Sequence, residues 1–174
     1  EAQTEKLMEV CRMRDTPVIV FINKMDREGH DAFDLLDEIE SKLKIKVRPM
    51  SWPIGIGATF KGVYHMQKDE LNLFDGNKTN IEKNVIQTKG INDQSLSDLI
   101  GEEATEILRE EVELVDGVYD KFDRENYLKG KIAPVFFGSA LNNFGVQELL
   151  DSFIDISPIP QGRSSEKRTI EPNE

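Results

Sequence analysis

The sequence contains little cysteine and histidine, and its basic residues are outnumbered by acidic ones. Cys11 is the single cysteine among 174 residues, so an internal disulfide is excluded and a reducing, cytoplasmic setting is expected. The two histidines, His30 and His65, have no partners at metal-ligand spacing, so no metal site is predicted. The formal net charge of −11 argues against direct nucleic-acid binding, because phosphate backbones are held by basic residues. No apolar run approaches the roughly 20 residues of a membrane span, and no membrane contact is expected.

Two segments, by contrast, have the pattern of a buried strand followed by a helix. Residues 18–22 form an unbroken apolar run, which predicts a central strand of a parallel sheet, buried on both faces. Asp31 is the predicted N-cap of the helix that follows. Residues 134–137 repeat the strand pattern, and the loop GSALNNFG then leads into a helix through residues 146–154. Two such units predict an α/β fold with a mostly parallel sheet and flanking helices.

The segment between these two units has a different pattern. Short strand signals around residues 47–52, 63–66 and 71–74, with KDEL as a hairpin turn, predict an α+β insertion. Ser95 begins a predicted long acidic helix with Asp98 as its capping partner. The insertion is therefore expected to combine a small sheet with one long helix.

These patterns divide the chain into four parts. Residues 1–46 and 131–160 are assigned to the α/β domain, residues 47–130 to the insertion, and residues 161–174 to a linker leading to a following domain. The first helix, over residues 1–14, lacks an N-cap signal. This favours a fragment of a longer protein over a natural start after processing, because an uncapped helix leaves backbone N–H groups without partners.

The first predicted strand ends in the tetrapeptide NKMD, residues 23–26. Ligands of open parallel sheets bind at the carboxyl ends of the strands, so these side chains are candidate binding residues. The Asp26 carboxylate offers two acceptors to the N1–H and N2 donors of guanine, whereas adenine would leave it unpaired. Asn23 is expected to orient the loop and reach the base edge, and Lys24 to lay its methylene stem over the base. An ordinary polar loop is the alternative interpretation.

The second predicted strand ends in GSALNN, residues 138–143. Backbone N–H groups of Ala140 and Leu141 can donate to guanine O6, where adenine carries an amino group instead. Ser139 can support the Asp26 loop through its hydroxyl group. Neither motif is specific by itself, but their occurrence after two buried strands favours a guanine site over coincidence.

The order NKxD and then SA-x at the ends of successive strand–helix units resembles the G domain of translational GTPases. INKMDREG, followed later by PIG and GSAL-NFGVQELLD, narrows the resemblance to the elongation factor G and release factor 3 group. WPIGIGATFKGVYH with PVFFGSALNNFGV is most similar to the bacterial peptide chain release factor 3 family. The resemblance covers nearly the whole chain and corresponds to the C-terminal part of a P-loop GTPase G domain with its insertion.

This resemblance implies a function and a set of partners. It implies a ribosome-stimulated GTPase that binds GTP and GDP, with Mg²⁺ ligands outside this chain, and that expels class I release factors after termination. It also implies that guanine is recognised by Asn23, Lys24 and Asp26 with help from Ser139, Ala140 and Leu141. In this group the insertion faces the ribosomal stalk, so the acidic helix is a candidate stalk contact, although a solvated helix face is the favoured interpretation. An elongation factor G-type translocase, or a stalk-binding module without nucleotide function, are the alternatives.

A phosphate-binding loop of the form GxxxxGK[ST] is missing. The nearest candidate begins at Gly55, but Phe60 stands in place of the second glycine and Gly62 in place of the Ser/Thr. Without this loop there is no phosphate cradle and no hydroxyl group for Mg²⁺. We therefore expect no catalytic residue within this chain and no GTP hydrolysis by the chain alone.

Overall fold

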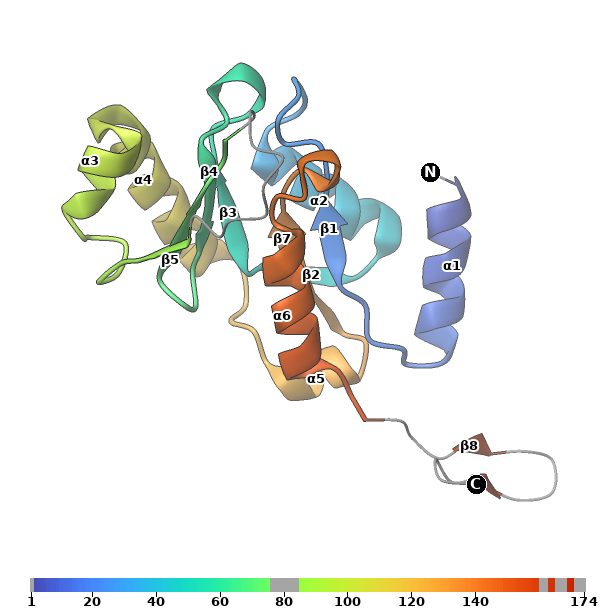
Figure 1. Cartoon of the computed structure of the whole chain (residues 1–174). Coiled ribbons are helices and arrows are strands. Elements are labelled where there is room, and N and C mark those ends of the chain that lie inside the picture. Colours follow the sequence, from blue (N-terminus) through green and yellow to red (C-terminus); the bar gives the residue numbers. More distant parts are fainter. Residues whose placement is uncertain (1, 76–84, 160–162, 165–168, 171–174) are drawn as a thin grey trace.

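The computed structural model describes residues 2–75, 85–159, 163–164 and 169–170, and it contains one parallel sheet (Figure 1). The strands β1 (Val20–Ile22), β2 (Lys46–Pro49) and β7 (Ile132–Phe137) lie in the order β1–β7–β2. Both neighbours pair with β7 in parallel, with Val20 opposite Val135 and Val47 opposite Ala133. Every residue of β7 is buried. The prediction of an α/β fold with a parallel sheet is confirmed.

The predicted position of the first strand in this sheet is wrong. Among the described residues β1 pairs only with β7, so it lies at an edge, and its side chains are mostly half-buried. The central, fully buried strand is β7. An apolar run without alternation does not distinguish these positions, because helices can cover parts of an edge strand from both faces.

Helices flank the parallel sheet. The helix α2 (Ala32–Leu43) begins as predicted at Asp31, whose Oδ1 accepts a 2.8 Å hydrogen bond from the Phe33 N–H. α1 (Ala2–Met13) packs against α2, and α5 (Arg124–Leu128) packs against β7. The helix α6 (Val146–Ile156) follows the loop after β7 and crosses in front of the sheet in Figure 1. No helix in the part of the chain that the structure describes is long and apolar enough to cross a membrane.

A second, antiparallel sheet follows directly after β2, with Met50 alone between the two. Its strands are β3 (Ser51–Ile54), β4 (Gly62–His65), β5 (Glu70–Leu73) and β6 (Val85–Gln87), in that order. The one-turn helix η1 (Gly57–Thr59) lies in the turn between β3 and β4. The predicted insertion begins at residue 47, but β2 (Lys46–Pro49) belongs to the parallel sheet and so extends across this boundary. The division of the chain into domains stays a prediction.

The predicted long acidic helix is two helices, α3 (Ser95–Ile100) and α4 (Glu102–Val118). Gly101 separates them with φ +88°, a left-handed conformation that interrupts a helix and that glycine adopts without a steric cost. The expected capping role of Asp98 is also wrong, since the Ser95 N–H donates to Asp93 Oδ1 at 3.0 Å.

The predicted linker over residues 161–174 lies largely outside the described residues. Its described residues form two short strands, β8 (Arg163–Ser164) and β9 (Thr169–Ile170), which pair antiparallel.

One hydrophobic core joins the two sheets. Trp52 of β3 is fully buried, and its ring contacts Phe33 of α2 and Phe137 of β7 at centroid distances of 4.7 and 5.6 Å. Its indole N–H donates to Glu111 of α4 at 2.7 Å. Side chains from α2, both sheets and α4 thus pack as one cluster, and the antiparallel sheet is held firmly beside the parallel one.

A buried histidine in β4 gives the fold a predicted pH dependence. His65 is 2% exposed, lies beside the Phe136 ring and finds no hydrogen-bond partner for either ring nitrogen among the described residues. Burial, with a smaller contribution from Lys68, lowers the pKa of His65 to about 4. The unfolded chain, with a His pKa of about 6.5, binds the proton first. Stability is therefore complete above pH 6.5 and falls as the pH drops towards 4, by up to about 3 kcal/mol.

Urea denaturation of the wild type and of His65→Phe between pH 7 and 4.5 tests this prediction. The difference in unfolding free energy between the two proteins should shift in favour of the variant as the pH falls, because phenylalanine takes up no proton. Comparing the two removes the contributions of carboxylates, which both proteins share. Parallel pH profiles would show that His65 is not the group responsible.

Candidate nucleotide-binding site

The two motif-bearing loops leave neighbouring strands and are bonded to each other. Because β1 and β7 pair in parallel, with Ile22 opposite Phe137, both loops begin at the same edge of the sheet. The Gly138 N–H donates to the Ile22 carbonyl at 3.0 Å, and the Met25 N–H donates to the Gly138 carbonyl at 3.1 Å. The strand pairing thus continues into the loops, and the structure brings the NKMD and GSAL segments together.

Asn23 links the two loops through its side chain. Its Oδ1 accepts hydrogen bonds from the N–H groups of Lys24 and Ala140, both at 2.8 Å. This is the orienting role expected for Asn23. The Ala140 N–H therefore already donates to Asn23, and it could donate to guanine O6 only by sharing its hydrogen between the two acceptors. The O6 contacts of Ala140 and Leu141 stay predictions.

Asp26 presents one carboxylate oxygen with a partner and one without. Its Oδ2 accepts a 3.2 Å hydrogen bond from the Asn142 side-chain amide. Its Oδ1 is buried and finds no hydrogen-bond partner among the described residues. A buried carboxylate oxygen without a donor is costly for a folded protein. The site therefore lacks one donor at the atom that the sequence predicts to meet guanine.

Ser139 supports the Asp26 loop indirectly. Its side chain is buried and its Oγ accepts from the Asn142 amide at 2.9 Å, the same amide that contacts Asp26. Its backbone N–H and carbonyl both bond to Phe144, each at 3.0 Å, which closes the loop. Asn142 was not assigned a role from the sequence, although it lies within GSALNN. Nothing in the sequence around Asn142 indicates that its side chain contacts Asp26 and Ser139.

The remaining predicted residues are exposed at the loop surfaces. Lys24 has φ +70°, an uncommon conformation for a residue other than glycine that costs on the order of 1–3 kcal/mol. Leu141 lies on the one-turn helix η2 (Ala140–Asn142) and is 79% exposed. Their side chains are therefore accessible to a ligand at the junction of the two loops.

Gly138 is the residue that permits the two ends of the GSALNNFG loop to approach each other. A Cβ atom at this position would lie 2.3 Å from the Phe144 carbonyl oxygen and 2.8 Å from Cζ of Phe21. Any larger residue would force the backbone at Gly138 away from Phe144 and Gly145 at the other end of the loop. The glycine before Ser139 is thus required by the close contact of the backbones, a reason that only the folded structure supplies.

Across the described ranges no group of three or more His, Cys, Asp or Glu residues could hold a metal ion.

The fold and the paired loops define the class of this protein. A parallel sheet flanked by helices, with an antiparallel sheet beside it, is consistent with a fragment of a GTPase G domain. Residues 1–159 match the family described as "Elongation factor Tu GTP binding domain". The chain belongs to this family, and it is thus a domain of a translational GTP-binding protein. The predicted resemblance to translational GTPases is confirmed at this level.

Proposed function

We propose that this chain supplies guanine recognition in a translation termination factor of the release factor 3 type. Such a factor uses GTP to release class I release factors from the ribosome. The family match supports a translational GTPase, and the segments WPIGIGATFKGVYH and PVFFGSALNNFGV favour the release factor 3 group over elongation factor G.

The buried Oδ1 of Asp26 is the observation on which guanine recognition depends. Guanine N1–H and its N2 amino group are two parallel donors, and a carboxylate accepts both. Because Oδ1 is buried and without a partner among the described residues, the Asp26 side chain would rotate to meet one donor with Oδ1, and the other donor would compete with Asn142 for Oδ2. Lys24 would cover one face of the base, and Ser139, Ala140 and Leu141 would complete its surroundings.

The phosphate chemistry is proposed to lie in other parts of the intact factor. The sequence contains no GxxxxGK[ST] loop, so hydrolysis and the Mg²⁺ ligands are assigned to residues outside this chain. Apolar side chains on α1 and α6 are exposed and would be covered there: Leu7, Val10, Met13, Leu150, Phe153 and Ile154. On this proposal the isolated chain does not hydrolyse GTP and binds it weakly at best, so GDP binding at micromolar concentration or tighter would contradict it.

A release assay tests the termination role. The intact factor with GTP is expected to accelerate dissociation of a fluorescently labelled class I release factor from ribosomes that have completed peptide release. Acceleration of tRNA translocation instead would assign the chain to an elongation factor G-type translocase. Ribosome binding that does not depend on guanine nucleotide would favour an interaction module.

The ribosomal stalk is proposed to contact α4. Glu106 and Glu110 are exposed on this helix, and a basic partner surface would complement them. Replacing both with lysine is expected to weaken stalk binding by roughly tenfold at low salt, because like charges would then face each other. The measurement is a titration of the intact factor with isolated stalk protein, and unchanged affinity would exclude this contact.

A further inference from the structure

The turn between β3 and β4, residues 55–60, contacts the NKMD loop directly. The Gly57 N–H donates to the Met25 carbonyl at 2.9 Å, and Met25 is buried. A Cβ atom at Gly57 would lie 3.2 Å from the Glu28 nitrogen and 3.4 Å from the Arg27 carbonyl carbon. The backbone of the antiparallel sheet thus lies against the backbone that follows Asp26, without an intervening side chain.

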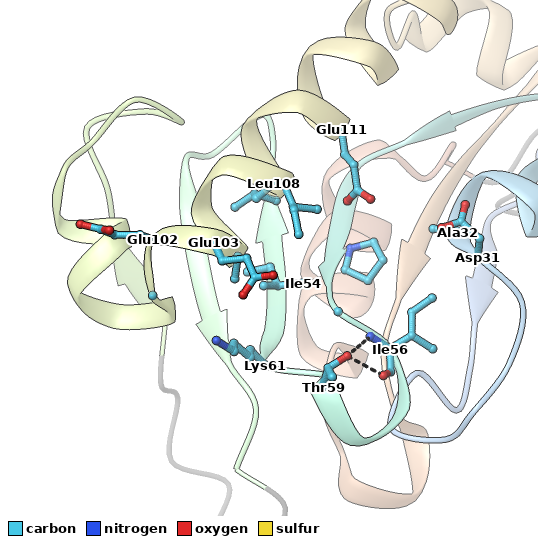
Figure 2. A pocket seen from close by; sticks show the side chains of 15 residues that line it. Asp31, Ala32, Ile54, Ile56, Thr59, Lys61, Glu102, Glu103, Leu108 and Glu111 are labelled. Carbon is cyan, nitrogen blue, oxygen red and sulfur yellow. Dashed lines mark hydrogen bonds between the residues drawn. The ribbon is translucent and has the colours of Figure 1, made fainter.

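This turn is held by its own hydrogen bonds. The Thr59 hydroxyl accepts from the Ile56 N–H at 3.2 Å and donates to the Ile56 carbonyl at 2.9 Å, as Figure 2 shows. Gly55 has φ +73°, and a Cβ there would lie 2.3 Å from the Thr59 carbonyl oxygen. The turn also borders a cavity of about 680 Å³ beside α4, so its conformation depends on these local bonds more than on packing from that side.

The end of the same turn holds the GSAL loop. Phe60 contacts Phe144 edge to face with ring centroids 5.6 Å apart, and Phe74, which follows β5, contacts both rings at 5.2 Å. Phe144 is bonded through its backbone to Ser139 in both directions. Asn72 of β5 also donates to Glu148 of α6. The second loop is therefore anchored to the antiparallel sheet by an aromatic cluster.

We propose that the turn of residues 55–60 and the Phe60–Phe74–Phe144 cluster position the two loops for guanine recognition. This inference depends on the proposed guanine site. A carboxylate meets two donors of a base only if both loops keep their relative placement, since hydrogen bonds weaken steeply when misaligned. The antiparallel sheet and its turn fix one loop at Met25 and the other at Phe144, and through this placement they contribute to base selectivity.

Gly57→Ala in the intact factor tests the proposal, with Gly130→Ala as the matched control. Both glycines are left-handed, with φ +60° and +64°, so both substitutions impose a similar backbone strain. Only at Gly57 would the methyl group press on the loop after Asp26, because the nearest atom to a Cβ at Gly130 is 3.4 Å away, on Thr16. The readout is the affinity for GDP relative to inosine diphosphate, which lacks the N2 amino group.

Gly57→Ala is expected to reduce the preference for GDP over inosine diphosphate by about tenfold, the equivalent of one weakened charge-assisted hydrogen bond. Gly130→Ala should leave this ratio unchanged, whereas a general loss of stability would lower both affinities together. Thr59→Val provides a second variant that removes the Ile56 bonds at an exposed position and should shift the ratio in the same direction. An unchanged ratio in both variants would overturn the proposal.

The outcome for Asp26→Asn separates this inference from the proposed function. If that substitution abolishes guanine preference while Gly57→Ala and Thr59→Val leave the ratio unaltered, guanine recognition stands and the positioning role fails. If Asp26→Asn has no effect on preference, the guanine site itself is wrong, and the positioning role fails with it.

Discussion

Replacing Asp26 with asparagine is expected to convert the intact factor from a guanine-binding to a xanthine-binding protein. The asparagine amide cannot accept from both N1–H and N2, but its NH₂ group can donate to the C2 oxygen that xanthine carries in place of the amino group. Loss of a paired, charge-assisted contact at a buried oxygen should weaken GDP binding on the order of 10³-fold or more. Equilibrium titrations with fluorescent GDP and xanthosine diphosphate measure the exchange of preference.

Asp31→Asn is the matched control for this prediction. Asp31 lies five residues further along and caps α2 through its Oδ1. Asparagine caps helices as well as aspartate does, so this variant should fold and keep its guanine preference. A factor with Asp26→Asn that still selects GDP over xanthosine diphosphate would show that another group recognises the base, and the buried Asp26 Oδ1 would then need a different explanation.

The positions of the two loops could be predicted from the sequence because the signals are local. Each motif directly follows an apolar run, and parallel strands place their carboxyl ends at one edge of the sheet. The interpretation of Asp26, Asn23 and Ser139 as neighbours needed no more than this. The contact between Asn142 and Asp26 could not be predicted, because it joins residues 116 positions apart through side-chain conformations.

The contact between the antiparallel sheet and the NKMD loop could not be predicted from the sequence either. Gly57 resembles part of a failed phosphate loop in the sequence, and only the fold places its N–H against the Met25 carbonyl. The division of the acidic helix at Gly101 could not be predicted either, because a local sequence pattern is ambiguous at a glycine. Glycine inside a helical pattern costs about 1 kcal/mol and is often tolerated, so the pattern alone does not show that the chain turns there.

Trp52 lies where the antiparallel sheet meets the rest of the core, and its contacts make Trp52→Ala the substitution with the largest expected effect on stability. The ring lies between Phe33 and Phe137, and the indole N–H bonds to Glu111. Removing it would leave a cavity where α2, α4 and both sheets meet, at a cost of about 4 kcal/mol. That is a large fraction of the 5–15 kcal/mol that stabilises a typical domain. Urea denaturation of this chain, followed by far-UV circular dichroism, measures the loss.

Trp52→Phe separates the packing contribution of the ring from its hydrogen bond. Phenylalanine would keep most of the contacts with Phe33 and Phe137, so the loss should be about half that of alanine or less. It would also leave the Glu111 carboxyl without the indole donor. Burial already raises the pKa of Glu111, and the Trp52 hydrogen bond partly opposes this, so the pKa should rise further in the variant. Equal losses for alanine and phenylalanine would mean that the hydrogen bond, rather than the packing of the ring, holds the antiparallel sheet to the core.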